Sequence, residues 1–132
     1  MEINGRYKKT GEALKRLHEA VARENLTDME RDGLIQRFEF SFEILWKCAK
    51  DYLRDYEGID AASPKKVIRS SLSVGLLTPE ETKLALDMAN DRNLTAHTYD
   101  DILAADMVER IKKYSPLMEK WYKAILSSRE GE

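Results

Sequence analysis

Cysteine, histidine and proline are scarce in this chain, and each scarcity narrows the kind of protein it can be. The 132 residues include one cysteine, two histidines and three prolines. Cys48 alone can form neither an internal disulfide nor a cysteine-rich zinc site, and its apolar neighbours predict that it is buried. No apolar run approaches membrane-spanning length, and the first residues lack the apolar core of a signal peptide. We therefore expect a cytoplasmic protein with no membrane association.

The motifs of several common enzyme classes are also missing. The sequence contains no glycine-rich phosphate loop, no His-Glu-x-x-His, no cysteine pair and no Gly-x-Ser-x-Gly. No segment alternates apolar and polar residues as a strand does, so the chain offers no sheet for the acidic metal site of a nucleotidyltransferase. We therefore predict no metal and no cofactor. The net charge of −2 gives no overall attraction to nucleic acid, so any RNA would be held locally or by a surface built from two subunits.

What the chain does contain is typical of a helical domain. It is 42% hydrophobic and 35% charged, with only six glycines, which argues against disorder. Its length is enough for one domain with its own core, so we expect a single domain over residues 1–132. Apolar residues recur at helical spacing. The predicted fold class is all-α: an antiparallel, up-and-down, four-helix-type bundle with one or two extra short helices.

The first two helices are predicted from apolar spacing. One runs from about Tyr7 to Arg23 after an irregular start, and the longest runs from the turn at residues 25–28 to about Tyr56, where Gly58 closes it. The apolar stripe of the longest helix is broad enough to pack on several neighbours. We interpret its aromatic residues as core rather than base-stacking groups: Phe38, Phe42 and Trp46. On its exposed face an i,i+4 pair is predicted: Glu43 and Lys47.

Proline and capping residues predict the remaining helices. Ser63-Pro64 and Thr78-Pro79 each open a helix, with a hydroxyl at the N-cap and proline at the first helical position. A last helical pattern begins at Asp100-Asp101. We expect Ser115-Pro116 to kink or restart it, and we expect residues 127–132 to be a polar tail. The total is five or six helices, two of them long.

One stretch gathers the chemically useful side chains. Between Arg92 and Tyr99 lie a guanidinium, the amide of Asn93, the imidazole of His97 and a phenol. Arginine binds phosphate bidentately, and histidine exchanges protons near neutral pH. An amide can fix a ligand or the imidazole by hydrogen bonds. Together these groups suit phosphodiester chemistry without a metal.

Helical geometry alone does not bring the arginine and the histidine of this stretch together. On a continuous helix Asn93 and His97 share a face, whereas Arg92 and His97 lie ~140° apart. Either the arginine reaches round the helix, or the helix breaks near Thr95, or a second subunit completes the site. In a purely structural alternative, Arg92 and His97 cap the helix end and bridge to nearby aspartates. Those candidate partners are Asp87, Asp91 and Asp100.

A small basic cluster on the predicted third helix is the second choice for phosphate contacts. It consists of Lys65, Lys66 and Arg69. Most basic clusters of this kind are solvated helix faces, and that is the alternative interpretation of these three residues. If the protein binds phosphate groups, however, their positive charge makes this helix a possible contact surface.

The chemically useful stretch resembles a known motif. Residues 92–99 are similar to the Arg-x4-6-His motif of HEPN domains, in the Arg-x4-His-x-Tyr form. The segment Arg37–Lys47 resembles the aromatic, Glu- and Lys-bearing helix of the branch named for nucleotidyltransferase substrate-binding proteins, which is related to HepT toxins. The Ser63-Pro64 opening and the turn at residues 75–77 also fit, and the resemblance covers nearly the whole chain. It implies a helical bundle that pairs as a homodimer or a higher homo-oligomer, with two Arg/His motifs near the interface.

The resemblance also implies a partner and a function. The partner would be a minimal nucleotidyltransferase, and the substrate RNA or a nucleotide. In the main interpretation the chain is a metal-independent ribonuclease toxin: Arg92 stabilises charge on the phosphate, His97 exchanges a proton, and Asn93 orients His97 or a phosphate oxygen. The partner would silence it by transferring AMP to Tyr99. The alternative is a non-catalytic substrate- or nucleotide-binding subunit of a two-chain nucleotidyltransferase, and a third is a helical dimerisation protein without a site.

Overall fold

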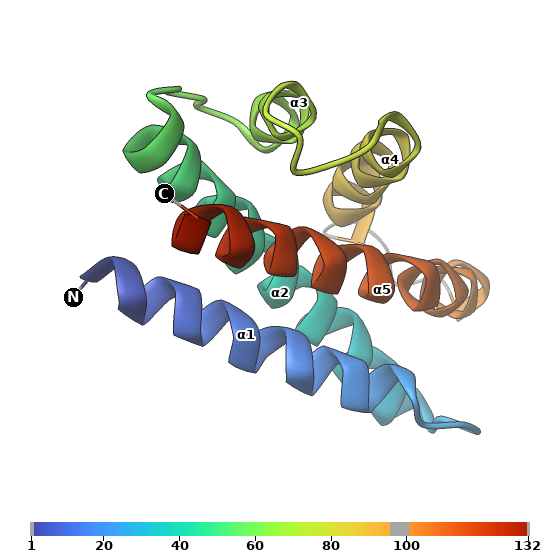
Figure 1. Cartoon of the computed structure of the whole chain (residues 1–132). Helices are drawn as coiled ribbons and strands as arrows, with labels where there is room; N and C mark the ends of the chain where they lie inside the picture. Colours follow the sequence, from blue (N-terminus) through green and yellow to red (C-terminus); the bar gives the residue numbers. More distant parts are fainter. Residues whose placement is uncertain (1, 96–100, 132) are drawn as a thin grey trace.

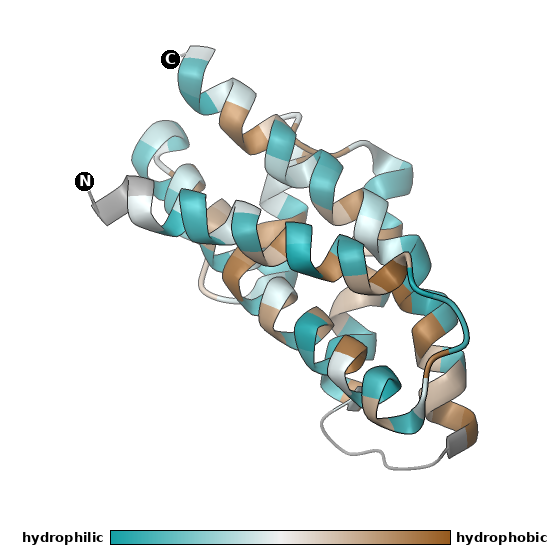
Figure 2. Cartoon of the chain, turned by 90° about the horizontal axis from the view of Figure 1, so that it is seen from below, coloured by the Kyte–Doolittle hydropathy of each residue, from teal (hydrophilic) through white to brown (hydrophobic). Residues whose placement is uncertain are grey.

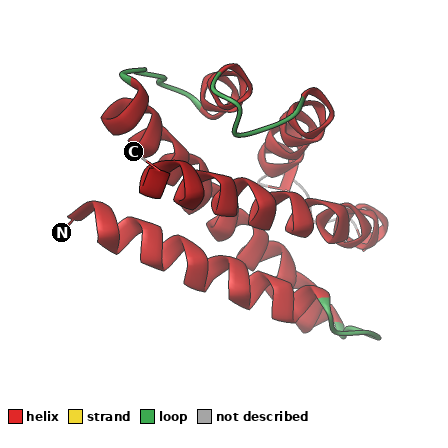
Figure 3. Cartoon of the chain, viewed as in Figure 1, coloured by secondary structure: helices red, strands yellow, loops and turns green. Residues whose placement is uncertain are grey.

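The structure, a computed structural model, describes residues 2–95 and 101–131, and all regular structure among them is helical (Figure 3). The five helices are α1 (Glu2–Val21), α2 (Asp28–Glu57), α3 (Pro64–Ser73), α4 (Pro79–Thr95) and α5 (Asp101–Gly131). The predicted all-α bundle is therefore confirmed, but three of the described helices rather than the expected two are long: α1 has 20 residues, α2 has 30 and α5 has 31. None of the described helices is both long and apolar enough to span a bilayer.

Local hydrogen bonds at the predicted helix starts explain where the helices begin. The Thr27 hydroxyl accepts from the Glu30 N–H at 3.1 Å, and the Glu30 carboxylate accepts from the Thr27 N–H at 2.9 Å. Thr78 and Glu81 form the same reciprocal pair at the start of α4. Ser63 caps α3 through the N–H three residues later. These contacts satisfy backbone donors that a helix start leaves unpaired.

The two ends of the chain are more helical than the sequence pattern predicts. α1 already begins at Glu2, and α5 extends to Gly131 through the segment expected to be a polar tail. The Arg129 guanidinium lies 4.2 Å from the centre of the Tyr7 ring. This cation–π contact joins the last turns of α5 to the first turns of α1. The expected tail is therefore wrong, because tertiary contact extends the helix beyond its apolar pattern.

α5 also continues through Pro116, where we expected a kink or a restart. Proline lacks an N–H and its ring crowds the carbonyl four residues earlier, which disfavours a helix interior by about 3 kcal/mol. The side chains that follow it are almost fully buried in the core: Leu117, Met118, Trp121 and Ile125. Their burial offsets the local penalty, so the predicted restart is wrong.

The three long helices lie alongside one another, and α3 and α4 cross them on one side (Figure 1). α1 runs antiparallel to α2, since Arg6 pairs with Asp51 and the Ala13 carbonyl, further along α1, accepts from Ser41 Oγ at 3.3 Å, earlier on α2. It also runs antiparallel to α5, where the Tyr122 hydroxyl donates to the Tyr7 carbonyl at 2.8 Å and His18 pairs with the earlier Glu119. Gly11 permits this close approach, because a Cβ there would lie 2.6 Å from the Tyr122 hydroxyl. Hydrophilic residues cover the outer faces of the helices (Figure 2).

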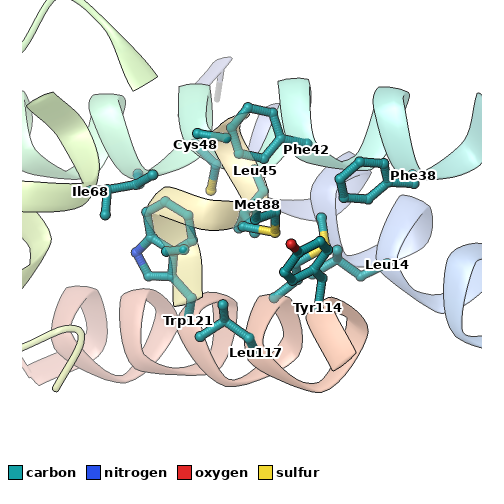
Figure 4. Close-up of a cluster of buried hydrophobic side chains, with 14 of the residues drawn as sticks. Leu14, Phe38, Phe42, Leu45, Cys48, Ile68, Met88, Tyr114, Leu117 and Trp121 are labelled. Atoms are coloured by element: carbon teal, nitrogen blue, oxygen red, sulfur yellow. The ribbon is translucent and has the colours of Figure 1, made fainter. Parts of the chain in front are cut away.

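The core between these helices is apolar and aromatic (Figure 4). The Phe38 ring stacks on Tyr114 with centroids 5.9 Å apart, and Trp121 donates its indole N–H to Ser71 Oγ at 3.3 Å. Burial raises the pKa of the Cys48 thiol to about 12, so this residue is an inert core side chain, as predicted. Of the three aromatic residues predicted for the core, Phe38 and Phe42 are fully buried. Trp46 only packs against its edge.

Candidate functional site

Arg92 lies in the last turn of α4 and its side chain reaches across to α2. Its Nη1 atom is 3.6 Å from Oε2 of Glu39, and its Nε atom is 3.5 Å from Oε2 of Glu43. The Arg92 side chain is only 25% exposed. Its Nε is shielded from solvent and makes no hydrogen bond to a described residue, so charge attraction is what holds it. The guanidinium is thus kept in a fixed direction at the end of α4.

Thr95, the last described residue of α4, adds a further contact to this cluster. Its hydroxyl lies 2.6 Å from Glu39 Oε2 and 2.7 Å from the carbonyl oxygen of Arg92. The cluster therefore sets two carboxylates against one guanidinium. A phosphate that approaches Arg92 must compete with Glu39 and Glu43 for its positive charge.

Asp91, the residue before Arg92, pairs with the other neighbouring long helix. Its Oδ1 accepts from Nη1 of Arg110 at 2.9 Å, and its Oδ2 accepts a short hydrogen bond from the Tyr114 hydroxyl. Burial, and secondly this hydrogen bond, raise the pKa of Tyr114, so the phenol stays protonated and remains a donor. The alternative in which Arg92 bridges to Asp91 or Asp87 is wrong for the described pairs. Instead, consecutive residues of α4 attach it to two different helices.

Two of the predicted site residues, His97 and Tyr99, lie outside the described residues. The convergence of His97 with Arg92 therefore stays a prediction, as does the proposed modification of Tyr99. Asn93 is exposed. Thr95, the last described residue of α4, is helical, so which of the three predicted arrangements applies stays open.

The basic cluster lies in the first two turns of α3. Lys66 and Arg69 are exposed, and Lys65 is half-buried. No hydrogen bond or ion pair among the described residues links any of the three to Arg92. The structure therefore does not bring this cluster into contact with the arginine, and its role in phosphate binding stays a prediction.

Sequence reasoning missed the carboxylates that hold Arg92. Glu39 and Glu43 are spaced i,i+4 and so share one face of α2. The sequence pattern predicts a pair of Glu43 with Lys47, but Glu43 Oε2 faces Arg92, and Glu43 Oε1 accepts from Trp46 Nε1 at 3.4 Å. The available signal was the Glu-bearing segment 37–47 that carries the family resemblance. Nothing in that segment indicates which helix its carboxylates face.

Chemically, the end of α4 offers a fixed guanidinium beside two carboxylates, together with a third, buried carboxylate, Asp91, that faces α5. Among the described residues, no three histidine, cysteine or acidic side chains gather as they would around a metal ion. The arrangement presents the Arg92 guanidinium in a fixed direction, with Glu39 and Glu43 as competitors for its charge.

These features define an all-α bundle with a charged cluster at the carboxyl end of its fourth helix. The family described as nucleotidyltransferase substrate binding protein like matches residues 5–127. The chain belongs to this family, as the sequence resemblance predicted. Among curated proteins, none matches the chain.

Two solved structures are similar to this chain. A crystal structure of a Thermus thermophilus protein has a TM-score of 0.85 and 46% sequence identity, covering 88% of this chain and 98% of its own. A crystal structure of a mutant of the toxin–antitoxin MntA-HpeT has a TM-score of 0.77. Its matching chain is 16% identical, with 95% of this chain and 97% of that chain covered. At that identity the likeness establishes the fold alone.

Proposed function

We propose that this chain is the HEPN-type partner of a minimal nucleotidyltransferase and acts as a metal-independent ribonuclease toxin. The observation that carries the proposal is the oriented, three-quarters buried Arg92 directly before the segment that contains His97. Membership in the nucleotidyltransferase substrate-binding family supports the partner. The toxin–antitoxin named for the MntA-HpeT structure, which shares the fold, supports the toxin role.

The proposed reaction is an internal transfer at a phosphodiester. The ribose 2′-oxygen attacks phosphorus, the bond to the 5′-oxygen breaks, and a 2′,3′-cyclic phosphate forms. The proton lost by the 2′-hydroxyl is balanced by the proton gained by the leaving 5′-oxygen, and His97 exchanges protons with these oxygens. Arg92 stabilises the negative charge that grows on the phosphate oxygens, and Asn93 orients His97 or one of those oxygens.

The carboxylates around Arg92 have a consequence for this reaction. In the free protein Glu39 and Glu43 hold the guanidinium against α2. They also repel a phosphate, so ground-state binding at Arg92 is weakened while the orientation of the guanidinium is kept. The same repulsion acts on the charge that develops in the transition state, so the two carboxylates contribute by fixing the direction of the guanidinium, which stabilises that charge.

The nucleotidyltransferase partner would silence the enzyme at Tyr99. An AMP group on the phenol adds negative charge and bulk where an RNA phosphate must bind. We also expect two copies of the chain to pair with their Arg92 and His97 groups near the interface. Incubation with the partner and ATP tests the modification, since a mass increase of one AMP that persists in Tyr99→Phe would exclude this tyrosine as the sole acceptor.

The two histidines of the chain, His97 and His18, allow a matched test of the proposed ribonuclease activity. Purified protein is incubated with end-labelled RNA in the presence of EDTA, and His97→Ala is compared with His18→Ala. His18 is exposed and pairs with Glu119 at 3.4 Å on the α1–α5 face. We expect cleavage by the parent and by His18→Ala, and a loss of roughly 10²-fold or more in His97→Ala. An inactive parent protein, or equal activity of the two variants, would refute the ribonuclease.

The family description favours one second candidate, a non-catalytic subunit that binds the substrate of a two-chain nucleotidyltransferase. In that case the chain binds a nucleotide without cleaving RNA. Nucleotide affinity that survives His97→Ala but is lost in Arg92→Ala, measured by calorimetry, would favour this candidate over the ribonuclease.

A further inference from the structure

A second polar feature of α4 lies apart from the Arg92 cluster. A cleft of about 370 Å³ opens between α4 and α5, and its lining includes Leu84, Asp87, Asn90 and Lys113. This volume falls within the range of roughly 300–1,000 Å³ that is typical of small-ligand sites. Neither Arg92 nor its partners Glu39 and Glu43 line it, so the cleft is not part of the cluster described above.

The floor of the cleft is held in place by its own contacts. Asp91 is only 9% exposed and accepts from both Arg110 and Tyr114. The other terminal nitrogen of Arg110 pairs with Asp106 at 2.9 Å, and the Tyr114 ring stacks on Phe38. Groups that are already fixed need no ordering when a ligand binds, and this reduces the entropic cost of binding.

The rim of the cleft, in contrast, carries polar side chains whose hydrogen-bonding groups are not used by other described residues. Asp87, Asn90 and Lys113 make no hydrogen bond or ion pair with any other described residue. They offer an acceptor, an amide with both donors and acceptors, and a cationic donor. Leu84 and Asp87 are three residues apart on α4, as are Asp87 and Asn90, so one apolar side chain lies beside the two polar groups along the cleft.

The charges of the lining restrict the class of ligand. Two carboxylates, Asp87 and Asp91, are balanced by two cations, Arg110 and Lys113, so a simple anion or cation gains little overall. The fitting ligand carries one negative group together with hydrogen-bond donors and a flat apolar part. A nucleotide has a phosphate for Lys113, hydroxyl or amino donors for Asp87, and a base edge for the Asn90 amide.

We propose that the α4–α5 cleft binds one nucleotide of the RNA; this inference rests on the ribonuclease of the proposed function. The cleft is lined by residues of α4 and α5, whereas the Arg92 side chain reaches toward α2. The cleft and the Arg92 guanidinium therefore lie on different faces of α4, and the nucleotide in the cleft is a neighbour in the same RNA of the one whose phosphate contacts Arg92.

The test uses the full chain, with adenosine, guanosine, cytidine and uridine 5′-monophosphates as probes in calorimetric titrations, and a short RNA for kinetics. Lys113→Ala and Asn90→Ala alter the cleft. Lys112→Ala is the matched control, because it removes the same charge from an exposed neighbour that pairs with Glu109 at 3.1 Å outside the cleft. Thermal midpoints verify that each variant is folded.

We expect Lys113→Ala to weaken binding of the preferred monophosphate about tenfold or more, the effect of losing one hydrogen bond to a charged group. The KM for RNA should rise by a similar factor with little change in kcat, and Lys112→Ala should stay within about twofold of the parent in both assays. Unchanged affinity and KM in Lys113→Ala and Asn90→Ala would overturn the inference, as would the absence of saturable monophosphate binding by the parent.

The experiments give different results if the cleft inference is wrong and if the proposed ribonuclease function is wrong. If RNA is cleaved in a His97-dependent manner while the cleft variants behave like the parent, only the cleft inference fails. If monophosphates bind in a Lys113-dependent manner but no RNA is cleaved, the cleft is a nucleotide site and the ribonuclease is wrong. The second result would agree with a non-catalytic nucleotide-binding subunit.

Discussion

The apolar core and the carboxyl end of α4 are stabilised in opposite ways. In the core, Phe38, Phe42 and Trp121 are fully buried, and shape and apolar area hold them. At the end of α4, Asp91 and Arg92 are held by charged partners on two different helices. Apolar burial is a large and reliable source of stability, whereas buried or half-buried ion pairs contribute little net. The comparison teaches that the core maintains the bundle, while the charged end of α4 fixes directions at small gain in stability.

This difference is informative because the charged end directly precedes residues 96–100. α4 is attached to α2 through Arg92 and to α5 through Asp91, so its last turn has little freedom to rotate about its axis. The Arg92 side chain on this turn therefore keeps a defined direction. We therefore expect core variants to lose stability, and variants of the α4 end to lose function first.

The largest effect on stability should come from a buried phenylalanine of α2, and an exposed phenylalanine two residues further on is its control. Phe38 is 0% exposed and Phe40 is 61% exposed. Phe38→Ala should lower the free energy of unfolding by about 3–5 kcal/mol because it leaves a cavity beside Tyr114. Phe40→Ala should change it by less than about 0.5 kcal/mol. Urea unfolding followed by circular dichroism measures both, and similar losses would mean that burial does not separate the two positions.

Arg92→Ala should show the opposite profile to Phe38→Ala: a large loss of activity with a small loss of stability. Removal of the guanidinium should reduce RNA cleavage by about 10²–10³-fold, because charge on the transferring phosphate is no longer stabilised. The free energy of unfolding should change by no more than about 1 kcal/mol, since the ion pairs with Glu39 and Glu43 are partly exposed. Arg16→Ala, on the exposed face of α1, is the control. A large loss of stability with cleavage intact would make Arg92 a structural residue.

Two tyrosines of α5 allow a hydrogen bond to a charged acceptor to be compared with a hydrogen bond to a neutral acceptor. The Tyr114 hydroxyl donates to the Asp91 carboxylate, and the Tyr122 hydroxyl donates to the carbonyl of Tyr7. Tyr114→Phe should destabilise the protein by about 1.5–3 kcal/mol, and Tyr122→Phe by about 0.5–1.5 kcal/mol. Thermal or urea unfolding measures the difference. Equal effects would show that the carboxylate of Asp91 adds nothing beyond an ordinary acceptor.

Local rules were sufficient to predict much of the fold. The capping pairs Thr27–Glu30 and Thr78–Glu81 join residues three positions apart, and the left-handed Gly58, with φ of +69°, donates its N–H to the Leu53 carbonyl five positions earlier. Such signals are present in any short window of sequence. The continuation of α5 through Pro116 was not predictable in this way, because burial of distant partners overrides the local preference against a helix.

The candidate site was predictable only in part, for the same physical reason. Arg92 could be singled out because residues 92–99 resemble a family motif, whereas spacing alone left a structural role open. The partners of Arg92 could not be predicted, since Glu39 and Glu43 lie on α2, far earlier in the sequence. The network of Asp91, Arg110 and Tyr114 likewise depends on how α4 lies against α5. The sequence identified which residue types gather in the chain, and the packing of helices decides which of them meet.

The smallest effect should come from the amino end of α4, where an ion pair contrasts with the buried Asp91 at the other end. Glu81 lies 2.5 Å from Lys120 of α5 and also accepts from the Thr78 N–H. The hydrogen bond to Lys120, followed by that to Thr78, lowers the pKa of Glu81. A carboxylate with a lowered pKa stabilises the fold above the unfolded value, about 4.3, and this contribution is lost as the pH falls through the folded value. Glu81→Gln keeps the capping geometry and should therefore cost up to about 1 kcal/mol at pH 7, and this cost should shrink as the pH falls through the folded pKa. Urea unfolding at a series of pH values from 7 downward measures this change, and a constant loss across the series would mean that Glu81 acts through packing and capping rather than through its charge.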